Sequence, residues 1–164
     1  MNRINDQQLE QIVSRHGAAL VLYARQWCNL PDDAVQEALC ELVQAPEIPM
    51  DVVPWLFKAV RFRALNIARS ERRRDSHQRA ASQLRDAWFT CRTETNLEAA
   101  ELQIFLSKLP EMEREIVVAR VWGELTFEQI AELTDMASST VHRFYTRSMS
   151  RLKVLLDNQM ETRS

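Results

Sequence analysis

Apolar side chains recur at intervals of three and four residues along most of this 164-residue chain, the spacing that places them on one face of a helix. The pattern predicts a first helix over residues 6–27, a second that opens at Asn29 and Pro31, and a third that starts at Pro54. Proline suits the first turn of a helix because the amide hydrogen that it lacks would have no partner there. Strict apolar–polar alternation is almost absent and only two glycines occur, so we expect an all-α protein.

The third predicted helix combines an apolar stripe with cations and aromatic rings on its other faces. The stripe consists of Leu56, Val60, Ala64 and Ile67. The cations are Lys58, Arg61, Arg63, Arg69, Arg72, Arg73 and Arg74, and the interleaved rings are Trp55, Phe57 and Phe62. Rings that stack on bases, beside cations that hold phosphates, make a surface for single-stranded nucleic acid. The alternative is a core helix whose arginines reach water along apolar surface and whose rings only pack. The seven cations favour the nucleic-acid interpretation.

A polar stretch divides the chain. Residues 76–96 lack a clear period, which is typical of a linker. We therefore expect two small helical domains, residues 1–75 and 97–164, joined by a flexible linker. The second domain would begin with one helix and continue with another that starts after Pro110 and is closed by Gly123.

The stretch after that helix predicts two helices joined by a tight turn. Thr126 and Gln129 have the spacing of a capping box, in which each side chain satisfies a backbone amide at a helix start. The pattern breaks over residues 134–137, and the inward stripe of the next helix is Val141, Tyr145, Ser148 and Leu152. Its other face carries His142, Arg143, Thr146, Arg147 and Arg151. These are the parts of a DNA-reading helix-turn-helix, and the alternative is an αα-hairpin with a solvated basic face.

The formal net charge of −2 hides a strong segregation along the chain. Residues 1–54 carry −5 and residues 86–140 carry −7, whereas residues 55–85 carry +7 and residues 141–164 carry +3. Two basic islands between acidic segments suggest two contacts with a polyanion and two with something else.

Other classes of function lack their residues. Two glycines exclude a P-loop or a dinucleotide-binding turn, and no nucleophile–base set is visible, so we expect no enzyme and no cofactor. The cysteines and histidines are too scattered for a metal site: they are Cys28, Cys40, Cys91, His16, His77 and His142. Unpaired cysteines suit a reducing cytosol, the N-terminus is too polar for a signal peptide, and no apolar run could span a bilayer. We therefore expect a cytoplasmic protein without membrane insertion.

Taken in order, these segments resemble a bacterial RNA polymerase sigma factor of the sigma-70 family, of the extracytoplasmic-function (ECF) type. The resemblance rests on HGAALVLYARQW with DDAVQEAL, on WLFKAVRFRALNIARSERRR, on LSKLPEMEREIVVARVWGELTFEQIAEL and on SSTVHRFYTRSMSRLK. Together they cover nearly everything from Leu9 to Lys153. Departures from the usual pattern include Phe62, Asp135 and Phe144, where the family usually has asparagine, glycine and arginine.

The resemblance implies a promoter-specificity subunit that binds core RNA polymerase, recognises the −35 element and melts the −10 element. It implies contacts with the polymerase β′ clamp by Asp33, Val35, Gln36 and Glu37. It implies −10 contacts by Arg61, Phe62, Asn66, Arg69, Arg72 and Arg73. It implies −35 contacts by Ser139, Thr140, His142, Arg143, Phe144 and Arg147, with the second domain on the β flap. An anti-sigma factor is left open as a further partner.

Two other interpretations stay open at this point. One is a free-standing helix-turn-helix regulator, although no heptad or dimer helix supports the self-association that it would need. The other is an interaction protein that keeps the architecture without promoter activity.

Overall fold

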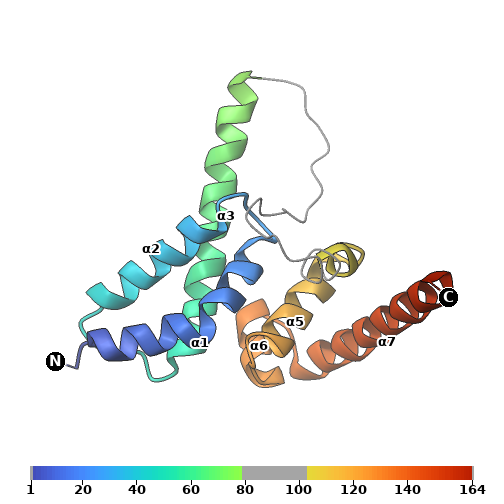
Figure 1. The fold of residues 1–164 in the computed structure, drawn as a ribbon. Coiled ribbons are helices and arrows are strands. Elements are labelled where there is room, and N and C mark those ends of the chain that lie inside the picture. Colours follow the sequence, from blue (N-terminus) through green and yellow to red (C-terminus); the bar gives the residue numbers. More distant parts are fainter. Residues whose placement is uncertain (1, 79–102, 164) are drawn as a thin grey trace. The chain divides into compact units, whose positions relative to one another are not determined.

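Helices and the turns between them make up the parts of the chain that the computed structural model describes, residues 2–78 and 103–163 (Figure 1). No strand occurs within these ranges, and the expected all-α class is confirmed. The chain divides into two compact units, Met1–Thr90 and Cys91–Ser164. Most of the predicted linker over residues 76–96 lies outside the described residues.

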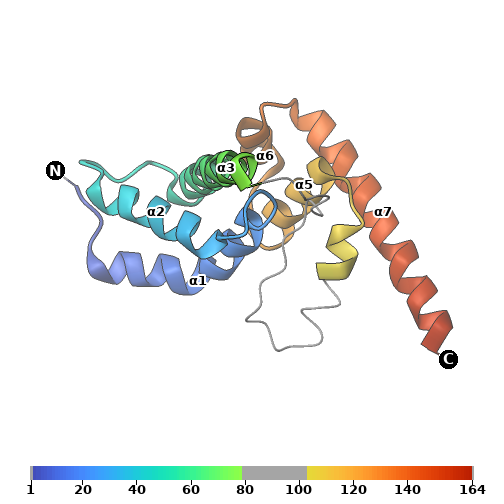
Figure 2. The same cartoon turned by 90° about the horizontal axis from the view of Figure 1, so that it is seen from above.

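Three helices form the first unit: α1 (Asp6–Ala24), α2 (Pro31–Gln44) and α3 (Val52–Gln78). Each packs against the other two. Figures 1 and 2 show α1 and α2 side by side, with α3 running across them. Helix α1 ends three residues before the predicted limit, because Trp27 lies in the turn that follows it. Helix α3 continues to Gln78, three residues into the predicted linker.

The core of this unit is built around Tyr23, which is fully buried. Its ring meets the rings of Trp27 and Phe57 edge to face, with 4.9 Å between centroids in both pairs, the geometry that aromatic pairs prefer. Cys28 is also buried, and the loss of solvation raises the pKa of its thiol to about 11, so the thiol stays protonated at neutral pH.

Two of the three aromatic residues on helix α3 have clearly different surroundings. Phe57 has no exposed surface, so for this ring the packing alternative is correct and the nucleic-acid interpretation is wrong. Phe62 lies on the open side with 59% of its surface exposed. The buried apolar residues of α3 are Leu56, Phe57, Val60, Ala64 and Ala68, whereas Ile67, which the sequence placed in the stripe, is half-buried.

The second unit contains helical residues 103–107 and then α5 (Glu111–Val121), α6 (Phe127–Thr134) and α7 (Ser138–Arg163). Helix α5 packs on both α6 and α7, and these two pack on each other. The fully buried apolar side chains of the unit are Leu106, Ile116, Val118, Ala119, Ile130 and Val141.

The turn after α5 begins at the glycine that the sequence predicts to close the helix. The residue in the left-handed region is Glu124, with φ of 57°, whereas neither glycine has positive φ. Gly123 instead donates its amide hydrogen to the carbonyl of Val118, and Leu125 donates to the carbonyl of Ala119, both at 3.1 Å. Gly123 thus directly follows the helix cap Trp122, as the sequence predicts, and the left-handed residue lies one position later.

Candidate nucleic-acid interface

The turn between α6 and α7 has the local geometry that the sequence predicts. At the start of α6, Thr126 Oγ1 accepts the amide hydrogen of Gln129 at 3.1 Å, and Gln129 Oε1 accepts that of Thr126 at 2.9 Å. The predicted capping box is confirmed. At its end, Asp135 takes φ of 56° and ψ of 43°, a left-handed conformation that aspartate adopts more readily than most residues. Helix α7 begins three residues later, at Ser138.

One aromatic side chain of α6, Phe127, contacts residues of both α5 and α7. The ring of Phe127 on α6 lies edge to face with His142, 5.0 Å between centroids, and with Tyr145, at 5.4 Å. On the other side the Arg120 guanidinium of α5 lies 4.4 Å from the same ring, and it donates to the carbonyl of Leu125 at 2.9 Å. These contacts fix the angle at which α7 leaves the turn.

The N-terminal half of α7 presents a polar and basic face to solvent. The six residues predicted to contact a −35 element all lie on it. Two of them, Thr140 and Phe144, are half-buried. The other four are exposed: Ser139, His142, Arg143 and Arg147. Val141 and Ser148 of the same helix face inward instead and are fully buried. A helix that follows a tight turn and exposes such a face can enter the major groove of duplex DNA.

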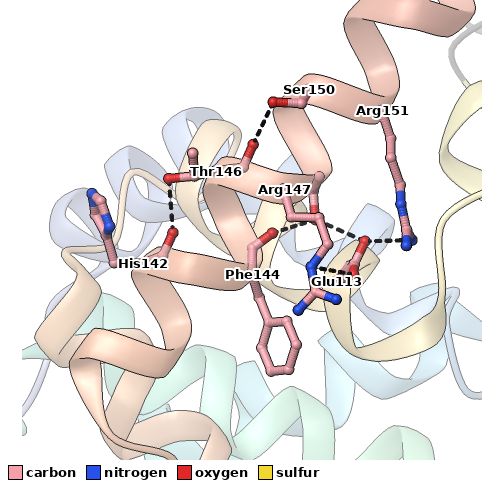
Figure 3. Close-up of polar contacts among 8 residues, drawn as sticks. Glu113, His142, Phe144, Thr146, Arg147, Ser150 and Arg151 are labelled. Atoms are coloured by element: carbon pink, nitrogen blue, oxygen red, sulfur yellow. Dashed lines mark hydrogen bonds and ion pairs between the residues drawn. The ribbon is translucent and has the colours of Figure 1, made fainter.

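A buried carboxylate lies beside this face, and the sequence analysis did not single it out. Glu113 on α5 is only 3% exposed and is approached by three side chains of α7 (Figure 3). Arg151 Nη1 donates to Glu113 Oε2 at 3.0 Å, and Arg147 Nε lies 3.6 Å from Oε1. The Ser148 hydroxyl lies 3.2 Å from Oε2 and 2.7 Å from the carbonyl oxygen of Phe144; its single hydrogen serves one of them at a time.

Arg147 has a second neighbour. Its guanidinium carbon lies 4.9 Å from the centroid of the Phe144 ring, which also has Arg143 at 5.8 Å. Such a distance allows a cation–π attraction. The side chain of Arg147 is nevertheless 46% exposed, so it is held from two sides and open on the rest.

Helix α3 carries the second basic face. Of the six residues predicted to contact a −10 element, Arg61 and Asn66 are half-buried. The other four are exposed: Phe62, Arg69, Arg72 and Arg73. The Arg61 guanidinium lies 5.3 Å from the ring of Trp27. Arg63 pairs with Glu41 on α2 at 3.1 Å and lies 5.9 Å from the Phe62 ring.

The predicted polymerase-binding residues of α2 divide into two groups. Asp33, Gln36 and Glu37 are exposed and line an open groove of about 420 Å³ between α2 and α3. Val35 is 6% exposed and belongs to the core of the unit. Among the described residues no group of acidic, histidine and cysteine side chains could hold a metal ion, and no helix there is long and apolar enough to cross a membrane.

The arrangement defines a class of protein: two helical units, the second with a helix-turn-helix whose second helix exposes a basic face. Comparison with known proteins then gives the family of this segment, since residues 99–152 match the family described as "Sigma-70, region 4". The resemblance to the sigma-70 family that the sequence motifs carry is thereby confirmed.

Two solved structures share the fold of the whole chain. One is the sigma factor RpoE in complex with the anti-sigma factor NepR, from Bartonella quintana; it is 19% identical with a TM-score of 0.66, covering 92% of this chain and 98% of that one. The other is CnrH in complex with the cytosolic domain of CnrY, 22% identical with a TM-score of 0.61, covering 94% and 90%. No curated protein matches the chain significantly by sequence.

Proposed function

We propose that this protein is a promoter-specificity subunit of bacterial RNA polymerase. It would bind the core enzyme, recognise −35 elements and melt −10 elements. The observation that carries the proposal is the region 4 match, because it falls on the helix-turn-helix with the exposed basic face. The protein would act by directing the polymerase and would catalyse no reaction itself. The protein would act in the cytoplasm, where the polymerase is.

In this proposal α7 lies in the major groove of the −35 element. His142, Arg143 and Arg147 are exposed on one side of the helix and supply donors for base edges and phosphates. Thr140 and Phe144 offer a methyl group and a ring edge to thymine methyl groups. The Phe144 ring also separates Arg143 from Arg147, which a third arginine in its place would not do.

Helix α3 takes the separated strand of the −10 element. Phe62 is an exposed ring among cations, which suits stacking on an unpaired base. Arg69, Arg72 and Arg73 continue the exposed basic surface along the same helix and would contact phosphates.

The acidic face of α2 docks on the polymerase β′ clamp. Asp33, Gln36 and Glu37 supply this surface, since they are exposed, whereas Val35 contributes by packing α2 onto its neighbours. The second unit docks on the β flap. Both solved structures are complexes with a second protein, and one of these proteins is named an anti-sigma factor, so we propose an anti-sigma factor as a partner of this chain also.

Transcription with purified core polymerase tests the proposal. Core enzyme with and without the protein would transcribe a library of fragmented genomic DNA from the same bacterium, and the transcripts would be sequenced from their starts. We expect a small set of new start sites that share an element at −35. The matched variants are Arg147→Ala, which should lose these starts, and Arg163→Ala at the far end of α7, which should keep them.

Two outcomes would contradict the proposal. Specific binding of duplex DNA by the free chain, without new starts on core enzyme, would favour a free-standing regulator. Binding to the core enzyme without new starts would favour an interaction protein.

A further inference from the structure

The carboxylate of Glu113 has a position that the proposed function does not yet use. It is buried on α5, and every contact described above joins it to α7, to side chains 34, 35 and 38 residues further along the chain. Burial of a charged group is unfavourable unless partners compensate it. Two guanidinium groups and a hydroxyl provide the compensation here.

The two arginines meet the carboxylate differently. Arg151 uses a terminal Nη1 at 3.0 Å, whereas Arg147 approaches with Nε at 3.6 Å. In Figure 3 the two terminal nitrogens of Arg147 point away from Glu113, beside the ring of Phe144. A guanidinium whose Nε side faces the carboxylate keeps both terminal amino groups for another planar acceptor, and these two groups can make a bidentate contact with guanine or phosphate.

We propose that Glu113 is a positioning residue for DNA recognition, which orients the Arg147 guanidinium with the help of the Phe144 ring. The inference rests on the proposed promoter-reading function of α7. The carboxylate lowers the overall attraction of α7 for any DNA, because it is a negative charge beside two cations. The carboxylate also reduces the number of orientations that the Arg147 guanidinium can adopt. Because the remaining orientation matches only some base edges, one DNA sequence is favoured over others.

This double role makes an unusual prediction for Glu113→Gln, which keeps the size of the side chain and removes its charge. Affinity for an arbitrary duplex should rise severalfold, whereas affinity for the preferred duplex should fall. The ratio of the two affinities should drop by about tenfold or more, the discrimination expected of one bidentate contact. A purely structural loss would weaken both duplexes together, and a purely electrostatic role would strengthen both.

The experiment uses the full chain assembled with core polymerase. Wild-type holoenzyme would first select a preferred duplex from a library with a randomised centre, and a shuffled version of that duplex would serve as the arbitrary one. Fluorescence anisotropy would then give both affinities for wild type, Glu113→Gln and Arg147→Lys. Arg147→Lys keeps the charge but lacks the two terminal amino groups of a guanidinium, so the ratio should fall with the shuffled affinity unchanged. The matched control is Glu132→Gln on the exposed face of α6, which should leave the ratio unchanged.

The outcomes separate this inference from the function beneath it. If wild type selects no sequence, the proposed function fails and the inference falls with it. If wild type selects a sequence but Glu113→Gln leaves the ratio unchanged, or weakens both duplexes equally, only the inference is overturned. If Glu113→Gln does not fold, Arg147→Lys decides alone, and an unchanged ratio in that variant rejects the positioning role.

Discussion

Helices α3 and α7 are both long and basic, and each has arginines beside a phenylalanine, yet their cations are held in different ways. On α7, Arg147 and Arg151 converge on a carboxylate that is almost completely buried. On α3, Arg63 pairs with Glu41, and both side chains of that pair are substantially exposed. The same residue types therefore make a fixed surface on one helix and an adaptable surface on the other.

Magnitudes support this distinction. An exposed ion pair such as that of Arg63 contributes about 0–1 kcal/mol, so water and salt compete with it easily. A buried charge that loses a partner is more costly, so the carboxylate of Glu113 holds its partners more firmly than Glu41 holds Arg63. A duplex presents base edges at fixed positions, and a fixed set of donors can match them. A single strand has no fixed shape, and a cation in a weak, exposed pair such as that of Arg63 can adjust to it.

The largest expected effect divides α3 into its two sides. Phe57→Ala should destabilise the protein by about 3–5 kcal/mol, since it removes a fully buried ring. Phe62→Ala should change stability by less than about 0.5 kcal/mol, because the ring is mostly exposed. Urea denaturation of both variants measures the difference. If Phe62→Ala proved as destabilising as Phe57→Ala, the open aromatic surface on α3 would not exist.

These two rings also show what the sequence can predict. The capping box of Thr126 follows from two residues three positions apart, and this prediction is confirmed. Phe57 and Phe62 look alike in the sequence, and only packing against Tyr23 on another helix separates them. Local patterns thus predicted the elements, whereas burial of individual side chains depended on contacts between helices.

Glu113 lay beyond sequence prediction for the same reason. Its position in the first turn of a helix suggests only a favourable interaction with the helix dipole. The signal that points further is Ser148, a polar residue on an otherwise apolar inward stripe, because a buried hydroxyl needs a partner. Nothing in the sequence identifies that partner 35 residues away.

The second prediction tests whether the two basic helices have separate roles. Arg147→Ala should weaken holoenzyme binding to duplex −35 DNA by about 1–3 kcal/mol, as expected for loss of a base contact. Arg69→Ala on α3 should leave that affinity nearly unchanged and reduce strand opening, measured by permanganate reactivity of unpaired thymines. The reverse result, with Arg69→Ala weakening duplex binding more, would break the comparison.

A smaller effect is expected at the turn that presents α7. Asp135 has positive φ, so a β-branched residue there should be strained. We expect Asp135→Val to lose about 1 kcal/mol or more, and Asp135→Gly to be tolerated. Thermal melts give the comparison, and equal midpoints for the two variants would mean that the turn does not hold this conformation in solution. The first unit offers no comparable site for this substitution, because none of its described residues has positive φ.

The smallest effect compares the helix starts of the two units. Each unit contains a capping box, Asn5 with Gln8 before α1 and Thr126 with Gln129 before α6. Replacement of either cap by alanine should cost about 1 kcal/mol, because one backbone amide loses its acceptor. The consequences should differ with helix length, since α1 has 19 residues and α6 has 8. Fraying of one turn leaves most of α1 intact but removes half of α6, together with the Phe127 contacts that fix the angle of α7. Thr126→Ala should therefore weaken binding to the preferred −35 duplex as well as stability, whereas Asn5→Ala should reduce stability alone. Thr126→Ser, which keeps the hydroxyl, is the control and should retain both. If Thr126→Ala lost stability without any change in duplex affinity, the orientation of α7 would not depend on the start of α6.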